Sequence, residues 1–249
     1  MIAITRDVTP SIVACELTHI DRQPIDPVMA AVEQREYRKL LASLGLEVVR
    51  IPGDPAYPDS VFIEDTAIVL DDLAVITRPG APSRRGETRA VADVLEQYRP
   101  LVHIEAPATI DGGDVLVLDD RIFVGMSTRS NEAAIGQLRF HTRRQVIPVD
   151  VHGALHLKTA VTRVSRDALL VNREWIDVAP FAGWKLIDID PSEPFAANAL
   201  LIGETVVCAA AFPRTNARLA ALGLDVRTID ASELAKAEGG VTCCSLLVR

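Results

Sequence analysis

The sequence predicts an α/β fold built from one repeated unit. Apolar runs broken by turn residues recur in the order strand, strand, helix, strand about every fifty residues, a period typical of repeat and propeller architectures. Val, Leu, Ile and Ala supply most of the apolar residues while aromatic residues make up only 4% of the chain, which favours strands and short helices. Finally, the apolar runs 2–5 and 245–248 at the two ends can pair with each other and complete a fifth unit.

The unit made from the chain ends begins with the strand 2–5, followed by a polar segment around Leu17 that we expect to be a loop. Asp26 and Pro27 are typical of a helix N-cap and a first helical residue. Apolar residues at positions 37, 40, 41 and 44 fall on one helical face, and Gly45 ends the helix. A strand over 46–51 completes this part.

Four internal units follow, each a hairpin and then a single strand. The hairpins pair 66–70 with 73–77, 114–118 with 122–125, 160–164 with 168–171, and 198–202 with 206–210. Helices can be placed in three units, over 91–98, from 127–129 to about 141, and from 213–215 to 223. The single strands are 102–105, 145–149, 185–190 and 225–229. Because no linker or charge block divides the chain, we expect residues 1–249 to form a single domain.

Charge and composition exclude several classes of function. The formal net charge of −8 argues against nucleic-acid binding, which needs a basic face. We identify no secretory signal and no apolar run long enough to span a membrane, so we expect a cytoplasmic protein with no membrane partner. The four cysteines show no metal-type spacing and are expected to be reduced thiols: Cys15, Cys208, Cys243 and Cys244.

The run 239–249 places a glycine pair ahead of two cysteines and a short apolar strand. Glycines permit turns that other residues avoid, so Cys243 can be partly exposed while the strand behind it is buried. A thiol held this way on a rigid element is suited to act as a nucleophile. The alternative is that Cys243 and Cys244 are two small apolar residues of a buried strand.

Three carboxylates, Asp59, Glu64 and Asp65, surround a short apolar stretch where one unit passes into the next. Buried acids need cationic partners or hydrogen bonds, and a guanidinium ligand supplies both through its planar fork. The alternative is that these acids cap a strand end and pair with Arg78 or Arg50.

A histidine and a second acidic turn are further candidates. His156 lies between apolar neighbours at the start of a strand, where a histidine is more often a satisfied core residue than a catalyst. Asp111 is followed by two glycines, a pattern that is common in turns. The alternative is that its carboxylate orients a histidine. Arg84 and Arg129 lie at strand-to-helix junctions, where they are either surface residues or bidentate carboxylate partners. Together these residues suit covalent chemistry on an amino acid with a guanidinium side chain.

Several runs carry a resemblance to a known family: 62–65 (Phe-Ile-Glu-Asp), 76–85 (Ile-Thr-Arg-Pro-Gly-Ala-Pro-Ser-Arg-Arg), 111–115 (Asp-Gly-Gly-Asp-Val), 156–158 (His-Leu-Lys), 196–198 (Ala-Ala-Asn) and 242–245 (Thr-Cys-Cys-Ser). Over nearly its whole length the chain resembles the dimethylarginine dimethylaminohydrolases of the guanidine-modifying (pentein) superfamily. The resemblance implies a five-bladed α/β propeller of strand-strand-helix-strand units with pseudo-five-fold symmetry.

The resemblance also implies a role for each matching residue. Cys243 resembles the nucleophile, His156 the general acid and base, and Asp111 the carboxylate that orients the imidazole. Asp65 resembles the main guanidinium partner and Glu64 a nearby hydrogen-bond acceptor. The resemblance further implies that the α-amino group of the substrate is contacted by Asp59 and the Leu17 backbone. It implies that the substrate carboxylate is contacted by Arg84 and Arg129. The Leu17 loop resembles a mobile lid.

The implied reaction is hydrolysis of Nω-methylated L-arginine to L-citrulline and a methylamine, by a monomer or homodimer using no metal or cofactor. Arginine deiminases and agmatine deiminases carry an acid where this chain has Lys158, which favours a methylated substrate. The alternatives are a deiminase-like or amidinotransferase activity on another guanidine, and a catalytically silent binder of methylarginine. Zinc captured by Cys243 and His156 would be adventitious, because two ligands fall short of a structural site.

Overall fold

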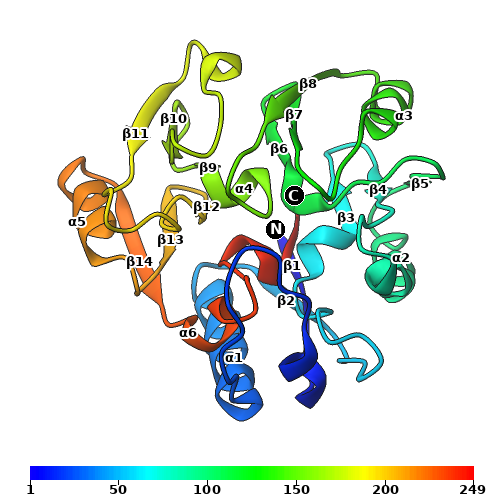
Figure 1. Cartoon of the computed structure of the whole chain (residues 1–249), viewed down its shortest axis with the longest axis horizontal. Coiled ribbons are helices and arrows are strands. Elements are labelled where there is room, and N and C mark those ends of the chain that lie inside the picture. The colour runs from blue at the N-terminus through cyan, green and yellow to red at the C-terminus, as the bar shows by residue number, and fades with distance from the viewer.

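The computed structural model describes all 249 residues as five three-stranded sheets arranged around a central axis (Figure 1). In every sheet the first pair of strands is antiparallel and the second pair is parallel. Four sheets are continuous in sequence: β3(Ala67–Val69), β4(Ala74–Ile76) and β5(Leu101–His103); β6(Val115–Leu118), β7(Arg121–Met126) and β8(Gln145–Asp150); β9(Val161–Arg163), β10(Ala168–Val171) and β11(Lys185–Asp188); β12(Ala199–Ile202), β13(Thr205–Ala209) and β14(Asp225–Ile229). The predicted five-bladed propeller is confirmed.

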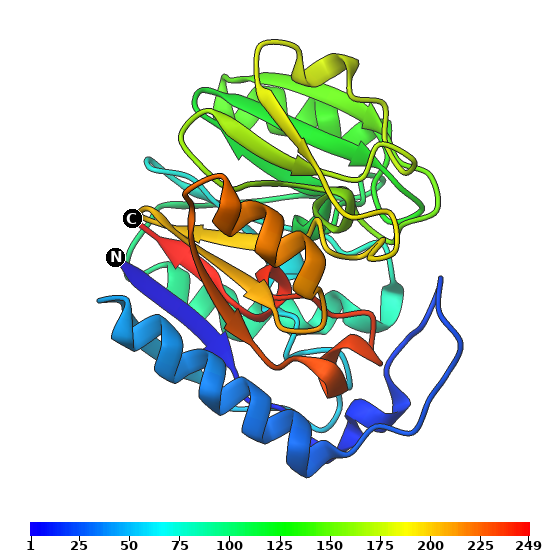
Figure 2. The same cartoon turned by 90° about the vertical axis from the view of Figure 1, so that its left-hand side faces the viewer.

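The fifth blade is assembled from both ends of the chain, as predicted. It consists of β15(Leu246–Val248), β1(Ile2–Arg6) and β2(Glu47–Ile51), with Ile2 opposite Val248 and Ile4 opposite Leu246. Figure 2 shows the two termini side by side at one end of the molecule. The ring is further joined by the Tyr37 hydroxyl, which lies 2.8 Å from the Ser245 hydroxyl.

Helices link the second and third strands of four blades. They are α1(Pro27–Ser43), α2(Thr88–Leu95), α3(Glu132–Thr142) and α5(Pro213–Ala221). The start of α1 follows the prediction, since the Asp26 carboxylate accepts the backbone N–H groups of Val28 and Met29. Gly45, with φ of 85°, ends the helix in a conformation that other residues adopt rarely.

The third blade departs from the repeat. Its second and third strands are joined through a short 3-10 helix, Ala179–Phe181, in place of an α-helix. Pro180 within this turn and Gly183 after it, with φ of 97°, prevent a longer helix. The fully buried Phe181 stacks on Phe123 of the neighbouring blade, with ring centroids 4.8 Å apart.

The hydrophobic core is divided into five clusters, one between each pair of adjacent blades. The largest contains 15 buried residues and joins β1, α1 and the short helix α6(Ser232–Ala235) to β12 and β13. Every blade is therefore packed on both sides. No helix is long and apolar enough to cross a membrane.

Candidate active site

The thiol, the imidazole and the acids Glu64, Asp65 and Asp111 gather because each of them lies in or beside a turn that precedes the inner strand of a blade. The turns concerned are η2(Ile63–Thr66) before β3, η4(Gly112–Asp114) before β6, α4(Leu157–Ala160) before β9, and η6(Thr242–Cys244) before β15. The repeat thus brings segments separated by up to 180 residues to one end of the ring. In Figure 2 this end lies opposite the two termini, on the side of the blue segment that follows η1(Pro10–Ala14).

His156 is buried and held by a carboxylate. Its Nε2 lies 3.0 Å from Asp111 Oδ2, and its Nδ1 lies 3.8 Å from Asp65 Oδ1. Burial alone lowers the pKa of His156, but the negative charge of Asp65 and the hydrogen bond to Asp111 outweigh it and raise the pKa to about 9. The imidazole is therefore protonated at neutral pH, with Nε2 directed to Asp111 and Nδ1 to Asp65.

The prediction that His156 lies at the start of a strand is wrong. The histidine occupies the N-cap position of the one-turn helix α4, which precedes β9. The helix forms here because Asp114, buried in the preceding blade, accepts the N–H of Leu157 at 3.0 Å. Burial raises the pKa of Asp114 to about 6, against the opposing charge of His156.

Asp65 is the most strongly held acid of the site. Its Oδ1 accepts the N–H of Gly113 at 2.9 Å, and its Oδ2 accepts from Arg84. Burial alone raises its pKa, but the charges of His156 and Arg84 lower it to about 2. Gly113 is required by this packing, because a Cβ there would lie 2.6 Å from His156 Nδ1 and 2.7 Å from Asp65 Oδ1.

Glu64 connects the acid pair to the cysteine turn. It accepts from the Lys158 ammonium through Oε1 and from the Thr242 hydroxyl through Oε2, the latter at 2.8 Å. Burial raises the pKa of Glu64, and the neighbouring Lys158 opposes that effect. Lys158 thus neutralises one of the two adjacent acids and leaves the other as the stronger anion.

Cys243 lies in the turn η6 and is partly exposed, whereas Cys244 is buried. Its Sγ accepts the N–H of Gly240 at 3.3 Å. Burial raises the pKa of the Cys243 thiol to about 12, and the charges of Glu64 and Asp65 add to the effect. The sulfur is therefore a neutral thiol beside two acids.

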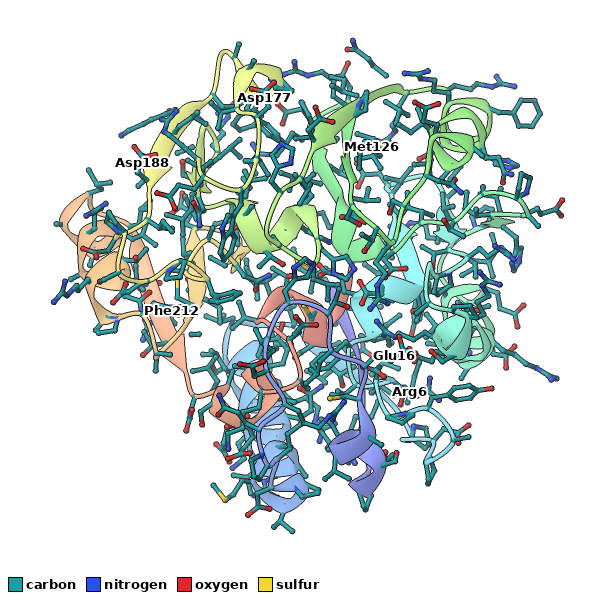
Figure 3. All side chains as sticks on the ribbon, in the orientation of Figure 1. Arg6, Glu16, Met126, Asp177, Asp188 and Phe212 are labelled. Atoms are coloured by element: carbon teal, nitrogen blue, oxygen red, sulfur yellow. The ribbon has the colours of Figure 1, made fainter.

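The segment around Leu17 lies against the same end of the ring. The N–H of Glu16 is directed to the Asp59 carboxylate, at 3.3 and 3.2 Å from its two oxygens. Burial raises the pKa of Asp59. The buried Arg129 donates to the Thr18 hydroxyl at 3.2 Å. Figure 3 shows Glu16 nearer to the middle of the ring than Asp188, which lies at its periphery.

Arg84 has a different environment from Arg129. Its buried guanidinium donates to the carboxylates of Asp65 and Glu87 and to the backbone carbonyls of Asp59 and Phe62. Its contact with a substrate carboxylate therefore stays a prediction, while its contact with Asp65 is a feature of the folded protein. The alternative that the acids of this stretch pair with Arg78 or Arg50 is wrong. Arg50 contacts Asp7, and Arg78 donates to a backbone carbonyl.

Asn198 also belongs to this group of residues, although no role was predicted for it from the sequence. Its amide donates to the Thr242 hydroxyl at 2.9 Å and to the Lys158 carbonyl at 3.1 Å, and its oxygen accepts the Thr242 N–H at 3.1 Å. It thus links the turn of the nucleophile candidate to the helix that follows the histidine. Asn198 directly precedes β12, the position occupied by site residues in the other four blades, so the repeat itself was the available signal.

A cavity of about 350 Å³ runs along the centre of the ring. All five inner strands line it, and Glu64, Lys158 and Thr242 border it toward the candidate site. Cys243 and His156 are not among its lining residues. The ion pair of Glu64 and Lys158 therefore separates this central cavity from the thiol and the imidazole.

One group of side chains has ligand atoms close enough for a metal ion: Asp65, Asp111 and His156. Their atoms already take part in hydrogen bonds, since Asp111 Oδ1 accepts the N–H of Gly80 at 2.8 Å and Oδ2 faces His156. A protonated imidazole has no lone pair for a metal. The arrangement therefore suits proton transfer better than metal binding.

Five blades around a closed ring, with a thiol, an imidazole and paired acids at one end, define a propeller of the guanidine-modifying superfamily. A family model described as eukaryotic N,N dimethylarginine dimethylhydrolase matches residues 22–182. The chain is 34% identical to a dimethylarginine dimethylaminohydrolase of Pseudomonas aeruginosa, covering 89% of both chains. It is 36% identical to one of Streptomyces coelicolor, covering 99% of this chain and 96% of the relative. The chain belongs to the dimethylarginine dimethylaminohydrolase family, whose members are hydrolases.

Solved structures agree with this assignment. A cysteine-to-serine mutant of the Pseudomonas aeruginosa enzyme in complex with citrulline superposes with a TM-score of 0.92, at 32% identity and with 98% and 97% of the two chains covered. A histidine-to-glycine mutant adduct of a dimethylarginine dimethylaminohydrolase with S-methyl-L-thiocitrulline gives the same TM-score at 33% identity, covering 98% of each chain. The N-terminal domain of a cyanobacterial arginine dihydrolase shares the fold, with a TM-score of 0.87 at 18% identity and coverage of 99% and 97%.

Proposed function

We propose that this chain hydrolyses Nω-methylated L-arginine to L-citrulline and methylamine or dimethylamine. The observation that carries the proposal is the acid pair Glu64 and Asp65. It lies between the turn of the Cys243 thiol and the His156 imidazolium, where a guanidinium would meet both. The named activity of the relatives and the citrulline bound to one of them support the same reaction.

Binding of the substrate cation activates the thiol. His156, with a pKa of about 9, is already protonated at neutral pH and so cannot accept the thiol proton. The charges of Glu64 and Asp65 contribute to the high pKa of Cys243, and a guanidinium between these groups opposes their effect. The bound cation therefore favours loss of the thiol proton to solvent water, which the partly exposed Cys243 can reach, and the thiolate forms only beside its target carbon.

The chemistry then proceeds in two halves. The thiolate adds to the guanidinium carbon, a C–S bond forms, and His156 gives its Nδ1 proton to the methylated nitrogen as the C–N bond breaks. The amine leaves, and a thiouronium remains on Cys243. Neutral His156 next takes a proton from water, the hydroxide adds to the same carbon, and the C–S bond breaks to release citrulline. Asp111 holds Nε2 throughout, so Nδ1 is the nitrogen that exchanges protons.

The α-groups of the substrate are assigned to the surrounding residues. Asp59 and the Leu17 backbone face the ammonium group. Arg129 takes the carboxylate, with a bidentate geometry that lysine lacks. Arg84 is the second proposed partner of the carboxylate, and its contacts with Asp65 and Glu87 also hold the guanidinium-binding acid in place.

Preference for a methylated substrate follows from Lys158. Its ammonium pairs with Glu64, which leaves Asp65 as the principal acceptor for guanidinium N–H groups. An N-methylated guanidinium has fewer N–H donors to satisfy than arginine has, and a site with fewer free acceptors fits it better.

The test is a comparison of citrulline formation from arginine, monomethylarginine and asymmetric dimethylarginine, with the released amine identified. We expect the methylated substrates to be favoured and Cys243→Ser to form no citrulline. Faster release of ammonia from arginine would identify a deiminase. Binding of methylarginine without turnover, in a protein whose Cys243 resists a haloacetamidine, would identify a silent binder.

A further inference from the structure

Glu238 is the residue from which we draw a further inference. It lies between α6 and the glycine pair that precedes the cysteine turn, five positions before Cys243. Its carboxylate accepts two consecutive backbone N–H groups from the opposite end of the chain. Oε2 accepts from Thr18 at 2.7 Å, and Oε1 accepts from His19 at 2.6 Å.

The backbone of Glu238 adds a second, independent observation. Its φ of 59° lies in the left-handed region, which a glutamate adopts rarely. The N–H of Glu238 donates to the Ala235 carbonyl at 3.1 Å, which fixes this conformation at the end of α6. A glycine would adopt the same turn without strain. What a glutamate adds at this position is its carboxylate.

The segment held by Glu238 has little structure of its own. Residues 16–26 form no helix or strand and donate no backbone hydrogen bond to another backbone carbonyl. Most of their side chains are exposed. The segment is positioned by side chains instead: Asp59 holds the N–H of Glu16, Arg129 contacts the Thr18 hydroxyl, and Glu238 holds the next two amides.

These contacts determine the direction of one carbonyl group. The Leu17 carbonyl and the Thr18 N–H belong to one peptide unit, which is trans, so they point in opposite directions. Because the Thr18 N–H is directed to Glu238, the Leu17 carbonyl is directed away from it. That oxygen accepts no hydrogen bond from the protein. Its peptide is flanked by the contacts to Asp59 and Arg129, the proposed partners of the substrate α-groups.

We propose that Glu238 is a positioning residue that orients the Leu17 carbonyl toward the substrate α-ammonium by holding the Thr18 and His19 amides. This inference rests on the proposed function for the identity of the substrate. The segment 238–243 would then both hold the loop around Leu17 and carry the proposed nucleophile.

Two variants separate the carboxylate from the backbone. Glu238→Gly removes the carboxylate and relieves the positive φ, so its fold is retained. Glu238→Gln keeps the shape but has one acceptor oxygen for two N–H groups. Glu204→Gln, in the exposed turn between β12 and β13, is the matched control.

The first measurement is amide hydrogen exchange in the protein without substrate, which is independent of any activity. We expect the Thr18 and His19 amides of Glu238→Gly to exchange about ten-fold faster than in the wild type, with Glu238→Gln between them. Exchange in Glu204→Gln should be unchanged. Wild-type protection of both amides in Glu238→Gly would overturn the proposal, whatever the protein does to methylarginine.

The second measurement compares asymmetric dimethylarginine with its analogue that lacks the α-amino group. In Glu238→Gly we expect kcat/KM to fall about ten-fold for the amino acid, mainly through KM, and less than about two-fold for the analogue. Equal losses on both substrates would overturn the assignment to the α-ammonium. If the wild type turns over neither substrate, the proposed function fails, while the exchange measurement still decides whether Glu238 holds the lid.

Discussion

Replacement of Asn198 by alanine tests whether this amide places the thiol relative to the histidine. The substitution removes three hydrogen bonds and leaves the Thr242 N–H and the Lys158 carbonyl without partners in a buried region. Each unsatisfied group costs about 1–2 kcal/mol, so we expect the free energy of unfolding to fall by roughly 3 kcal/mol. The Thr242 hydroxyl keeps its bond to Glu64, which limits the loss.

The effect on catalysis is the more specific part of this prediction. Thr242 adjoins Cys243, and Lys158 lies two residues after His156, so a loosened link shifts the thiol relative to the imidazole. A displacement of about 1 Å lowers kcat by about 10- to 100-fold, with a smaller change in KM. Stability is measured by urea unfolding, and kcat is measured at a temperature where the variant is fully folded.

Asn216→Ala is the matched control, because Asn216 is also buried but makes one bond, to the Ala209 carbonyl of its own blade. It should lose stability and retain kcat. An Asn198→Ala protein that unfolds more easily but keeps wild-type kcat would refute the link between this amide and the placement of the thiol.

Three further predictions concern the histidine, a glycine and the buried ion pair. The pKa of His156 is raised to about 9 in the folded protein, so its contribution to stability is complete below pH ~6.5 and is lost as the pH rises through ~9. The urea midpoint should therefore fall over this pH window by the equivalent of up to about 3 kcal/mol. His156→Gln should show a smaller decline. Equal declines in the two proteins would contradict the assignment of this pH dependence to His156. Gly113→Ala should abolish citrulline formation because the added Cβ displaces the imidazole. The control is Gly136→Ala, in α3 with nothing within 4 Å of the added Cβ, which should leave activity intact and raise the melting temperature slightly. An active Gly113→Ala protein would show that the packing around His156 is looser than described. Lys158→Met leaves Glu64 as an unpaired buried acid and should lower the free energy of unfolding in urea by about 3 kcal/mol. Most of this loss should be restored in the double variant with Glu64→Gln. No recovery would mean that packing of the lysine stem dominates.

The fold was largely predictable because its signals are local. Apolar runs of strand length, the Asp26 cap and the stop at Gly45 are each specified by a few adjacent residues, and their recurrence defines the blades. The closing pair of β15 and β1 could be inferred because each end offered one unpaired apolar run. The third blade was less predictable, since the Phe181 side chain of its 3-10 turn packs on Phe123 of the neighbouring blade, a contact that no local pattern marks.

The site was predictable as a set of residues but less so as a set of contacts. Cys243, His156, Asp111 and the acid pair were predicted on their chemistry and their motifs, and their catalytic roles stay predictions. The partners of Arg84 were not, because a long side chain reaches several carbonyls and carboxylates and sequence spacing does not select among them. The contact of Glu238 with Thr18 joins residues 220 positions apart, and no local pattern marks it.

The pairing of β15 with β1 has a consequence for how the protein folds during translation. The ribosome releases four blades and most of the fifth before the last strand and the adjoining thiol are available to fold. Until then β1 has an unpaired edge, and the acids and imidazole have no sulfur beside them. A nascent chain halted before residue 243 would lack the proposed nucleophile, so this thiol joins the site in the same step that completes the ring.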